Sequence, residues 1–418
     1  MKQYRLTAPS KLDATIDLPA SKSISNRALI IYALSGGSHL PQNLSDCDDT
    51  EVIIHAMRHM PATIDIKAAG TAMRFMTAYL SVMRGTYVLT GTERMKHRPI
   101  GVLVDALLKL GADIEYVGEP GFPPLRITGK ALEGGLLEVP GHISSQYISA
   151  LLMIGPKLKD GLTLRLMGDI ISKPYIDLTL WMMGEFGAEA EWTSSDTITI
   201  KPKSYKSRTY FIENDWSAAS YWYEMLALSD DPESEIRLTG LMDGSKQGDS
   251  ITRYIFSLLG VKTKFESKKA GVPQTITLQK NGRCVPRLEY DFMSCPDLAQ
   301  TFVVTCAAKN VPFHFTGLST LKIKETDRVE AMKREMRKLG YVLRDVNDSE
   351  LIWDGERCEP SLEQGIDTYE DHRMALAFAP FVQKQNGLLI NNPDVVTKSY
   401  PHFWEDLCRA GFGVETVK

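Results

Sequence analysis

The chain has 418 residues, of which 43% are hydrophobic and 24% charged, and its formal net charge is -4. This length allows two or three domains, each with a large hydrophobic core. The 48 Lys and Arg residues nearly balance the 52 Asp and Glu residues, so no overall positive field would attract nucleic acid, and we expect no nucleic-acid partner.

The N-terminus lacks the apolar core of about 7 to 15 residues that marks a signal peptide, and no apolar run approaches the roughly 18 residues that span a bilayer. We therefore expect a cytoplasmic protein with no membrane partner. The six cysteines form no C-x-x-C pair and no zinc spacing. This pattern indicates reduced, structural thiols and no metal site.

The first predicted helix has an unusual N-terminus. Residues 18–27 read LPASKSISNR and run directly into the apolar stretch 28–34. Unpaired N–H groups and the helix dipole attract anions at such a point, and Lys22 and Arg27 add positive charge. One interpretation is an anion site, above all for phosphate. The other is a buried helix capped by a serine, with two solvated cations.

An internal repeat follows along the whole chain. At five places an amphipathic helix pattern ends in a glycine and leads into a short alternating strand. A glycine at this point is typical of a helix C-terminus that needs a positive φ angle. Successive glycines are 71 to 80 residues apart, and a shorter sixth copy ends near Pro61. The five are Gly111, Gly187, Gly260, Gly340 and Gly411.

Each repeat also contains a helix pattern that is apolar on almost every side, which predicts a buried helix. The strands alternate apolar and charged residues, as in residues 261–265, so one face of each sheet should be solvated. We therefore predict an α/β fold with helices inside and sheets outside. The six apolar stretches are residues 28–34, 72–80, 146–154, 218–223, 298–304 and 373–379.

Cations recur near the predicted N-termini of the buried helices, although the helix dipole disfavours them there. Their recurrence favours an anion-binding cleft over solvated surface charges. Asp297 and Glu325 lie among them, which suits acid–base catalysis; an ordinary helix cap or first-turn acid is the alternative for either one. The cations are Lys22, Arg27, Arg74, Arg98, Arg373 and those of residues 322–328.

Three other sequence patterns that can mark a metal or nucleotide site are incomplete or absent. His55 and His59 are four residues apart but lack the glutamate of a zinc-protease helix. Residues 244–248 do not form a P-loop, and no G-x-G-x-x-G follows a strand. The usual ATP-binding and dinucleotide-binding folds are therefore excluded.

Eight motifs, in order along the chain, resemble those of the 5-enolpyruvylshikimate-3-phosphate (EPSP) synthase family of enolpyruvyl transferases. The resemblance implies a two-domain inside-out α/β barrel of six βαβαββ repeats, three in each domain. It assigns residues 21–212 to the first domain and residues 1–20 and 213–418 to the second, with the active site between the domains. The motifs lie at residues 21–27, 69–74, 94–101, 144–146, 172–177, 322–328, 371–375 and 398–401.

The resemblance also implies a reaction. Family members transfer the enolpyruvyl group of phosphoenolpyruvate to the 5-hydroxyl of shikimate 3-phosphate and release phosphate, in the pathway to chorismate and the aromatic amino acids. No metal or organic cofactor is implied, and we expect a monomer whose domains close over the substrates. Two phosphates and two carboxylates must be held together, which explains so many cations in an acidic chain.

Residue roles follow from the same resemblance. Asp297 is implied as the base for the 5-hydroxyl, Glu325 as a proton donor, and Lys22 as a residue that contacts both substrates; which carboxylate serves which proton step stays open. The implied residues for shikimate 3-phosphate are Lys22, Ser23, Arg27, Ser144, Ser145, Gln146, Ser172, Tyr175, Asp297 and Lys324. Those for phosphoenolpyruvate are Gly70, Arg98, Arg328, His372, Arg373 and Lys398.

Three positions depart from the family pattern, namely Ala68, Phe75 and Thr320. Two of them flank Gly70, so the shape of the phosphoenolpyruvate pocket and its sensitivity to the analogue glyphosate stay open. Two alternatives remain. One is the sister enolpyruvyl transferase that acts on UDP-N-acetylglucosamine, which has Asn after the lysine where Ser23 stands and commonly uses a loop cysteine. The other is a homologue that binds phosphorylated ligands without turnover.

Overall fold

The computed structural model describes residues 2–417. The chain forms two compact units, of which one consists of Ala20–Ile212 and the other of the chain before and after that segment. We call them the 20–212 unit and the terminal unit. Each contains its own cluster of buried apolar side chains. The chain passes between the units twice, after Pro19 and after Ile212.

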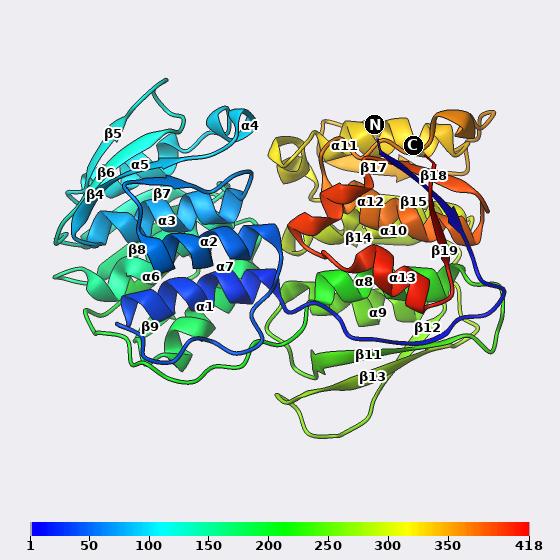
Figure 1. The fold of residues 1–418 in the computed structure, drawn as a ribbon, viewed down its shortest axis with the longest axis horizontal. Helices are drawn as coiled ribbons and strands as arrows, with labels where there is room; N and C mark the ends of the chain where they lie inside the picture. Colours follow the sequence, from blue (N-terminus) through cyan, green and yellow to red (C-terminus); the bar gives the residue numbers. More distant parts are fainter. Residues whose placement is uncertain (1, 418) are drawn as a thin grey trace. The chain divides into compact units, whose positions relative to one another are not determined.

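Helices form the interior of the 20–212 unit (Figure 1). Three are buried over most of their length because their sequences are apolar on nearly every side: α1 (Lys22–Leu34), α3 (Gly70–Val82) and α6 (Ser145–Ile154). The others are α2 (Asp48–His59), α4 (Glu93–Lys96), α5 (Gly101–Lys109) and α7 (Lys173–Glu185).

Two four-stranded sheets cover these helices. One has the order β3-β4-β6-β5 and the other β7-β8-β10-β9, and in each only the first pair is parallel. The strands of the first sheet are β3 (Thr63–Asp65), β4 (Gly85–Thr90), β5 (Asp113–Tyr116) and β6 (Leu125–Gly129). Those of the second are β7 (Gly135–Pro140), β8 (Leu162–Met167), β9 (Ala190–Trp192) and β10 (Thr197–Ile200).

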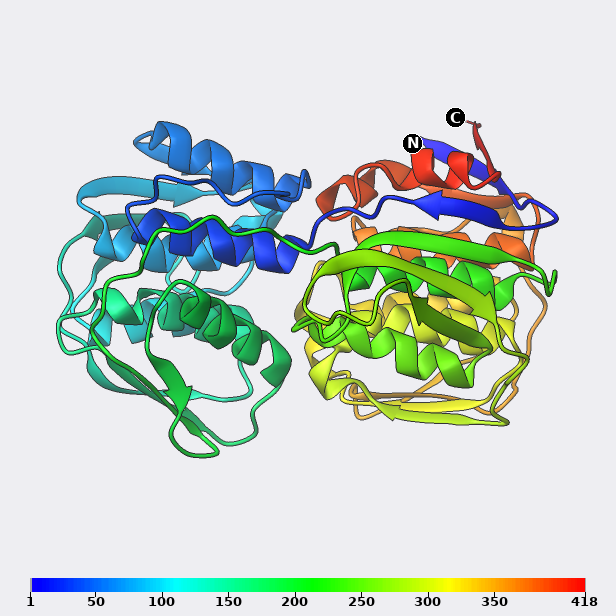
Figure 2. The ribbon, with the colours of Figure 1, turned by 90° about the horizontal axis from the view of Figure 1, so that it is seen from below.

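The terminal unit repeats this plan, with helices between layers of strands (Figure 2). Its buried helices are α8 (Trp216–Leu228), α10 (Ala299–Ala308) and α12 (His372–Phe378). The amphipathic partners are α9 (Thr252–Leu258), α11 (Arg328–Lys338) and α13 (Phe403–Arg409). Side-chain caps start several of them; Asp215, for example, accepts a hydrogen bond from the backbone N–H of Ala218.

Two of its three sheets show the same strand order as above, β2-β11-β13-β12 and β14-β15-β17-β16, again with only the first pair parallel. The third has the order β18-β1-β19 and joins the two ends of the chain. The strands are β1 (Gln3–Thr7), β2 (Asp13–Ile16), β11 (Glu235–Met242), β12 (Val261–Phe265), β13 (Pro273–Lys280), β14 (Leu288–Asp291), β15 (Phe313–Thr316), β16 (Arg344–Val346), β17 (Glu350–Trp353), β18 (Leu388–Asn391) and β19 (Gly413–Thr416).

The predicted α/β class with buried helices and outer sheets is confirmed. All five predicted glycines have positive φ angles, from 82° to 108°, as helix C-termini of this kind require. In the sixth copy the left-handed residue is Met60, just before Pro61, with a φ angle of 40°. Within residues 2–417, no helix is long and apolar enough to cross a membrane.

One repeat differs from the pattern. The segment that begins at residue 20 supplies the helix pair α1 and α2, but its strands are reduced to a single bridge between Gln42 and Phe211. Two backbone hydrogen bonds hold this bridge, from the N–H of Gln42 to the carbonyl oxygen of Tyr210 and from the N–H of Ile212 to the carbonyl oxygen of Gln42. They join the early part of the unit's sequence to its end. Five multistranded sheets therefore accompany six helix pairs over residues 2–417.

Candidate active site

Arg27 brings together the starts of four helices in the 20–212 unit. From α1 it donates hydrogen bonds to Thr179 Oγ1 on α7 (2.7 Å) and Ser149 Oγ on α6 (3.1 Å). Its guanidinium also lies 5.4 Å from the ring centre of Phe75 on α3. Each of these contacts falls within the first two turns of its helix, so the N-termini of α1, α3, α6 and α7 lie at the same end of the unit.

The Arg27 side chain is only 3% exposed. Its remaining donors reach the carbonyl oxygens of Ser23 (2.9 Å) and Tyr175 (3.4 Å). Burial lowers the pKa of Arg27 to about 10, which still leaves the group charged at neutral pH. In these contacts its charge faces neutral oxygen acceptors, so Arg27 adds positive potential to the helix ends that it joins.

Lys22 is the first residue of α1, directly after the capping residue Ser21. Its Nζ lies 3.4 Å from Oδ2 of Asp49, a buried carboxylate in the first turn of α2. Asp49 was not among the predicted site residues. The signal for it was a cluster of acidic residues at the start of an amphipathic helix, which is too common to single out one member.

Gly70 and Arg98 are in contact at the start of α3. A methyl group on Gly70 would lie 2.6 Å from Arg98 Nη1, so the absence of a side chain lets the guanidinium pack against the helix. The buried Arg74 supports this arrangement by donating to the carbonyl oxygens of Gly70 (3.1 Å) and Pro99 (3.0 Å). The two residues predicted for phosphoenolpyruvate in this unit therefore lie together.

The predicted serines lie at two further helix N-termini. Ser144 precedes α6 and accepts a hydrogen bond from the N–H of Gln146 (3.4 Å), whose side chain donates to Thr71 Oγ1 of α3 (3.1 Å). Ser172 precedes α7 in a left-handed conformation, with a φ angle of 54°. Ser145 and Ser172 are both buried. The donors expected for shikimate 3-phosphate thus occupy equivalent points of neighbouring helices.

The terminal unit contains a second cluster, centred on Arg328 at the start of α11. This side chain is 1% exposed and donates to three carboxylates: Asp371 Oδ2 (2.7 Å), Asp297 Oδ1 (2.8 Å) and Glu325 Oε2 (2.9 Å). Burial alone would lower the pKa of Arg328, but Asp371, Glu325 and Asp297 outweigh it and raise the pKa above its usual value. The arginine is therefore a fixed positive centre.

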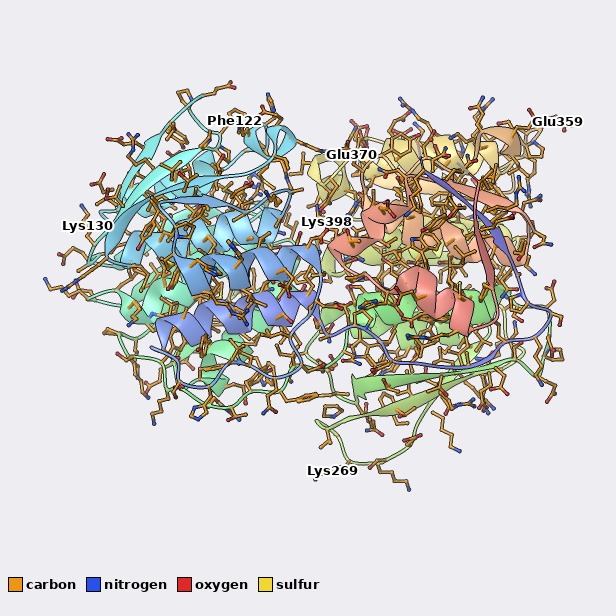
Figure 3. The ribbon with its side chains drawn as sticks, viewed as in Figure 1. Phe122, Lys130, Lys269, Glu359, Glu370 and Lys398 are labelled. Carbon is orange, nitrogen blue, oxygen red and sulfur yellow. The ribbon has the colours of Figure 1, made fainter. Side chains whose placement is uncertain are left out.

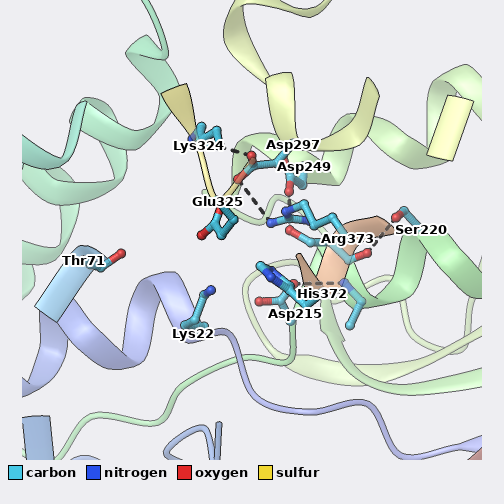
Figure 4. A network of polar contacts seen from close by, with 12 residues as sticks. Lys22, Thr71, Asp215, Ser220, Asp249, Asp297, Lys324, Glu325, His372 and Arg373 are labelled. Atoms are coloured by element: carbon cyan, nitrogen blue, oxygen red, sulfur yellow. Dashed lines mark hydrogen bonds and ion pairs between the residues drawn. The ribbon is translucent and has the colours of Figure 1, made fainter. Parts of the chain in front are cut away.

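Asp297 lies within ion-pair distance of three cations. Besides Arg328, it accepts a hydrogen bond from Arg373 Nη2 (3.1 Å) and lies 3.6 Å from Lys324 Nζ (Figure 4). Burial would raise the pKa of Asp297, but the charges of Arg373, Lys324 and Arg328 outweigh it and hold the pKa well below its usual range. Asp297 is ionised as long as these cations keep it as their partner.

Glu325 and His372 complete the cluster. Glu325 Oε1 lies 2.9 Å from the Nζ of Lys398, which is the last residue of the 3-10 helix Pro393–Lys398 and is labelled in Figure 3. His372 begins α12 and is buried, with Nδ1 3.6 Å from Oδ1 of Asp371. Asp371 also caps α12 by accepting from the N–H of Arg373 (2.9 Å).

In this second cluster, which we call the terminal cluster, a ligand anion can replace a carboxylate of the protein as the partner of a cation. Each of its cations has a carboxylate partner from the protein, so an anionic ligand would compete with Asp297 and Glu325 for the same donors. Such competition couples ligand binding to the proton affinity of the two carboxylates. The cations are Lys324, Arg328, Arg373 and Lys398, and the carboxylates are Asp297, Glu325 and Asp371.

The predicted site residues divide between the units. Ten belong to the 20–212 unit, namely Lys22, Ser23, Arg27, Gly70, Arg98, Ser144, Ser145, Gln146, Ser172 and Tyr175, and seven to the terminal unit, namely Asp297, Lys324, Glu325, Arg328, His372, Arg373 and Lys398. Asp371 was not a predicted site residue, although it lies in the motif at residues 371–375, yet it anchors both Arg328 and α12. Of the departures from the family pattern, Phe75 is buried against Arg27 and Ala68 is exposed.

Known proteins are similar to this chain over nearly its whole length. A family model described as EPSP synthase (3-phosphoshikimate 1-carboxyvinyltransferase) matches residues 6–66 and 60–407. A 3-phosphoshikimate 1-carboxyvinyltransferase from Bacteroides fragilis is 59% identical over 413 residues, which cover 99% of this chain and 99% of the relative. One from Shewanella halifaxensis is 34% identical over 432 residues, which cover 97% and 98% of the two chains.

Solved structures share the fold. An EPSP synthase from Acinetobacter baumannii matches with a TM-score of 0.80 and 20% sequence identity, covering 100% of both chains. An enolpyruvyl transferase from Streptomyces tendae matches with a TM-score of 0.74 and 16% identity, covering 100% of this chain and 99% of the other. At these identities the two structures bear on the fold alone.

Proposed function

The chain belongs to the EPSP synthase family, and we propose that it transfers the enolpyruvyl group of phosphoenolpyruvate to the 5-hydroxyl of shikimate 3-phosphate and releases phosphate. The observation that carries this proposal is the position of Asp297, within ion-pair distance of Arg328, Arg373 and Lys324. A partly buried carboxylate among cations suits a reaction that removes a hydroxyl proton beside an anionic co-substrate. The names of the relatives favour this reaction over the UDP-N-acetylglucosamine enolpyruvyl transferase and over a homologue without turnover.

We assign the anions of phosphoenolpyruvate to Arg328, Arg373 and Lys398 in the terminal unit, with His372 beside them, and to Gly70 and Arg98 in the other unit. Arginine donors in pairs match carboxylate and phosphate oxygens. We assign shikimate 3-phosphate to the helix N-termini that Arg27 joins, where N–H groups, hydroxyls and Lys22 supply hydrogen-bond donors. The residues of this second set are Lys22, Ser23, Arg27, Ser144, Ser145, Gln146, Ser172 and Tyr175, with Lys324 for the hydroxyls.

Substrate binding then activates the base. When the carboxylate and phosphate of phosphoenolpyruvate bind Arg328 and Arg373, these cations gain a second anionic partner and their hold on Asp297 weakens. The pKa of Asp297 rises toward its usual range, so the carboxylate gains affinity for the 5-hydroxyl proton. The base is therefore activated by the arrival of phosphoenolpyruvate and is weak in the free protein.

The atoms balance over two steps. In the first, Asp297 takes the proton of the 5-hydroxyl, its oxygen bonds to C2 of phosphoenolpyruvate and C3 gains a proton, which gives a tetrahedral intermediate. In the second, C3 loses a proton and C2 loses phosphate, which accepts the proton held by Asp297, and the double bond is restored in the product. Glu325 is the group that we assign to the proton on C3, and Lys398, 2.9 Å from it, stabilises its ionised form between the steps.

We also propose that the chain works as a monomer in the cytoplasm, where its substrates are water-soluble metabolites, and that it needs no cofactor. The residues of the two domains, 21–212 and 1–20 with 213–418, would serve one reaction, and ligand binding would close the domains around it. We propose this closure because the anions of the two substrates are assigned to residues of both units.

One assay tests the proposal. Purified protein is given phosphoenolpyruvate with either shikimate 3-phosphate or UDP-N-acetylglucosamine, and released phosphate is measured. We expect release with shikimate 3-phosphate only. Release with the UDP-sugar would favour the sister enzyme, and no release with either acceptor would favour a binding protein without turnover.

A further inference from the structure

Asp249 is a buried carboxylate close to the terminal cluster, and neither the proposed mechanism nor any of the eight family motifs assigns it a role. It lies in the 3-10 helix Gly248–Ile251 and is 3% exposed. Its Oδ2 accepts a hydrogen bond from Ser217 Oγ in the first turn of α8. Its Oδ1 is buried and has no hydrogen-bond partner among residues 2–417.

The backbone around Asp249 is fixed against the start of α8. Gln247 accepts from the N–H of Trp216 (3.1 Å) and donates to the carbonyl oxygen of Asn214 (2.9 Å). Together with the Ser217 bond, these contacts hold both the carboxylate and the residue two positions before it. Asp249 therefore has little freedom to turn toward solvent.

Charged groups from several elements face this carboxylate. Figure 4 shows it beside Asp297 and Arg373, and both interact with it electrostatically. Asp215, the cap of α8, adds a second negative charge, and Cys295 lies near enough for Asp249 to affect its thiol. The neighbouring helix α9 brings Arg253, but this arginine pairs with Asp243 at 2.7 Å.

We propose that Asp249 is a positioning residue for the enolpyruvyl transfer: its negative charge limits the pull of Arg373 on phosphoenolpyruvate and raises the proton affinity of Asp297. This inference rests on the function proposed above. Arg373 donates to Asp297, so a second carboxylate near both groups opposes the ionisation of Asp297 and shares the positive charge of Arg373.

The charge on Asp249 changes between neutral pH and mild acid. Burial raises the pKa of Asp249 to about 6, with Asp297 and Asp215 adding to the rise and Arg373 and Ser217 opposing it. The carboxylate is thus mostly ionised at neutral pH and mostly protonated in mild acid. Its influence on Arg373 and Asp297 should appear and disappear over the same interval.

The test compares wild type with Asp249→Asn, which keeps the size of the side chain and removes its charge. At about pH 7.5 we expect KM for phosphoenolpyruvate to fall about threefold and kcat to fall about tenfold, because Arg373 attracts the substrate more strongly and Asp297 is a weaker base. Below about pH 5 the two proteins should converge, since wild-type Asp249 is then protonated. The substrate titrates equally with both proteins, so their ratio isolates the residue.

Ser217→Ala is the matched control. It keeps the carboxyl group but removes a hydrogen bond that favours the ionised form, so the pH at which the Asp249 effect sets in should rise rather than the effect vanish. A ratio of wild type to Asp249→Asn that is constant with pH, or a raised KM for phosphoenolpyruvate, would overturn the proposal. If Asp249→Asn does not fold, an unshifted inflection in Ser217→Ala overturns it instead.

The two proposals fail differently. Wild-type protein that releases no phosphate from phosphoenolpyruvate and shikimate 3-phosphate contradicts the proposed function. Active wild-type protein with a pH-independent ratio contradicts only the role of Asp249.

Discussion

Arg328 donates a 2.8 Å hydrogen bond from Nη1 to Oδ1 of Asp297, the residue that the proposed mechanism uses as a base. The same guanidinium holds Glu325 and Asp371. Because Arg328 helps to lower its pKa, Asp297 is a weak base. The three carboxylates in turn partly neutralise the charge with which Arg328 would bind an anion. When a substrate anion also binds Arg328, the pKa of Asp297 rises. In the proposed mechanism, substrate binding and activation of the base therefore occur together.

The first prediction concerns this pair. Asp297→Ala should lower kcat by about 10² to 10⁴-fold, the usual contribution of a general base. Phosphoenolpyruvate binding should persist or tighten, because Arg328, Arg373 and Lys324 lose a competing carboxylate. Phosphate release measures the first effect and titration calorimetry the second. Turnover equal to wild type would remove Asp297 from the catalytic residues.

The second prediction concerns stability. Arg328→Ala leaves three carboxylates near one another without their shared cation, and removing one partner of a buried ion pair costs about 3 to 5 kcal/mol of the free energy of unfolding. The loss should shrink as pH falls. Without Arg328, one of the charges that lower the pKa of Asp297 is gone, so Asp297 takes up a proton at higher pH than in wild type and then no longer repels the other carboxylates.

Urea unfolding at neutral and acidic pH measures both effects. Lys322→Ala is the control, because this lysine lies in the same stretch of chain and also forms an ion pair, with Asp348 at 2.6 Å, but is accessible to solvent. Its replacement should leave the free energy of unfolding nearly unchanged. A loss in Arg328→Ala that does not depend on pH would contradict the electrostatic explanation.

The fold was readable from sequence because its signals are local. A glycine such as Gly111 marks its own helix end, where a positive φ angle is needed, and a stretch that is apolar on every side marks its own burial. The bridge between Gln42 and Phe211 left no such signal, because it depends on contact between distant parts of the chain. The reduced sheet of that repeat was therefore not predicted.

The site followed the same rule. The cations could be found from their positions near helix N-termini, but their partners could not. Arg328 pairs with Asp371 across 43 residues, and Arg27 reaches Ser149 and Thr179 across 122 and 152 residues. Sequence alone therefore predicted substrate contacts for Arg27, whereas the structure shows contacts with other helices of the unit.

The third prediction separates binding from stability at Gly70. In Gly70→Ala the new methyl group would lie 2.6 Å from Arg98 Nη1 and displace the guanidinium. Displacing Arg98, which we propose as a ligand of phosphoenolpyruvate, should raise KM for this substrate by about tenfold. The free energy of unfolding should change by less than about 1 kcal/mol, because alanine is favourable in a helix and Arg98 has a flexible side chain.

Gly184→Ala provides the comparison for this variant. Gly184 also lies in a helix, α7, and a methyl group there would meet no atom within 4 Å. Its replacement should leave KM unchanged and slightly increase stability. Steady-state kinetics and thermal unfolding of both variants check the prediction; equal KM values for the two would show that the contact between Gly70 and Arg98 does not serve the substrate.

The last prediction concerns Glu224, which is fully buried in α8, with both carboxyl oxygens lacking a hydrogen-bond partner among residues 2–417. Burial raises the pKa of Glu224 well above its usual value, so the folded protein keeps a proton that the unfolded chain loses. Stability should therefore fall as pH rises above the unfolded pKa, by about 1.4 kcal/mol per pH unit, until the folded group also ionises. Glu224→Gln cannot ionise and should lack this slope, whereas Glu233→Gln, at an exposed position, should keep it. Chemical unfolding measured from mildly acidic to neutral pH tests this difference, and parallel curves for wild type and Glu224→Gln would show that Glu224 ionises equally in both states.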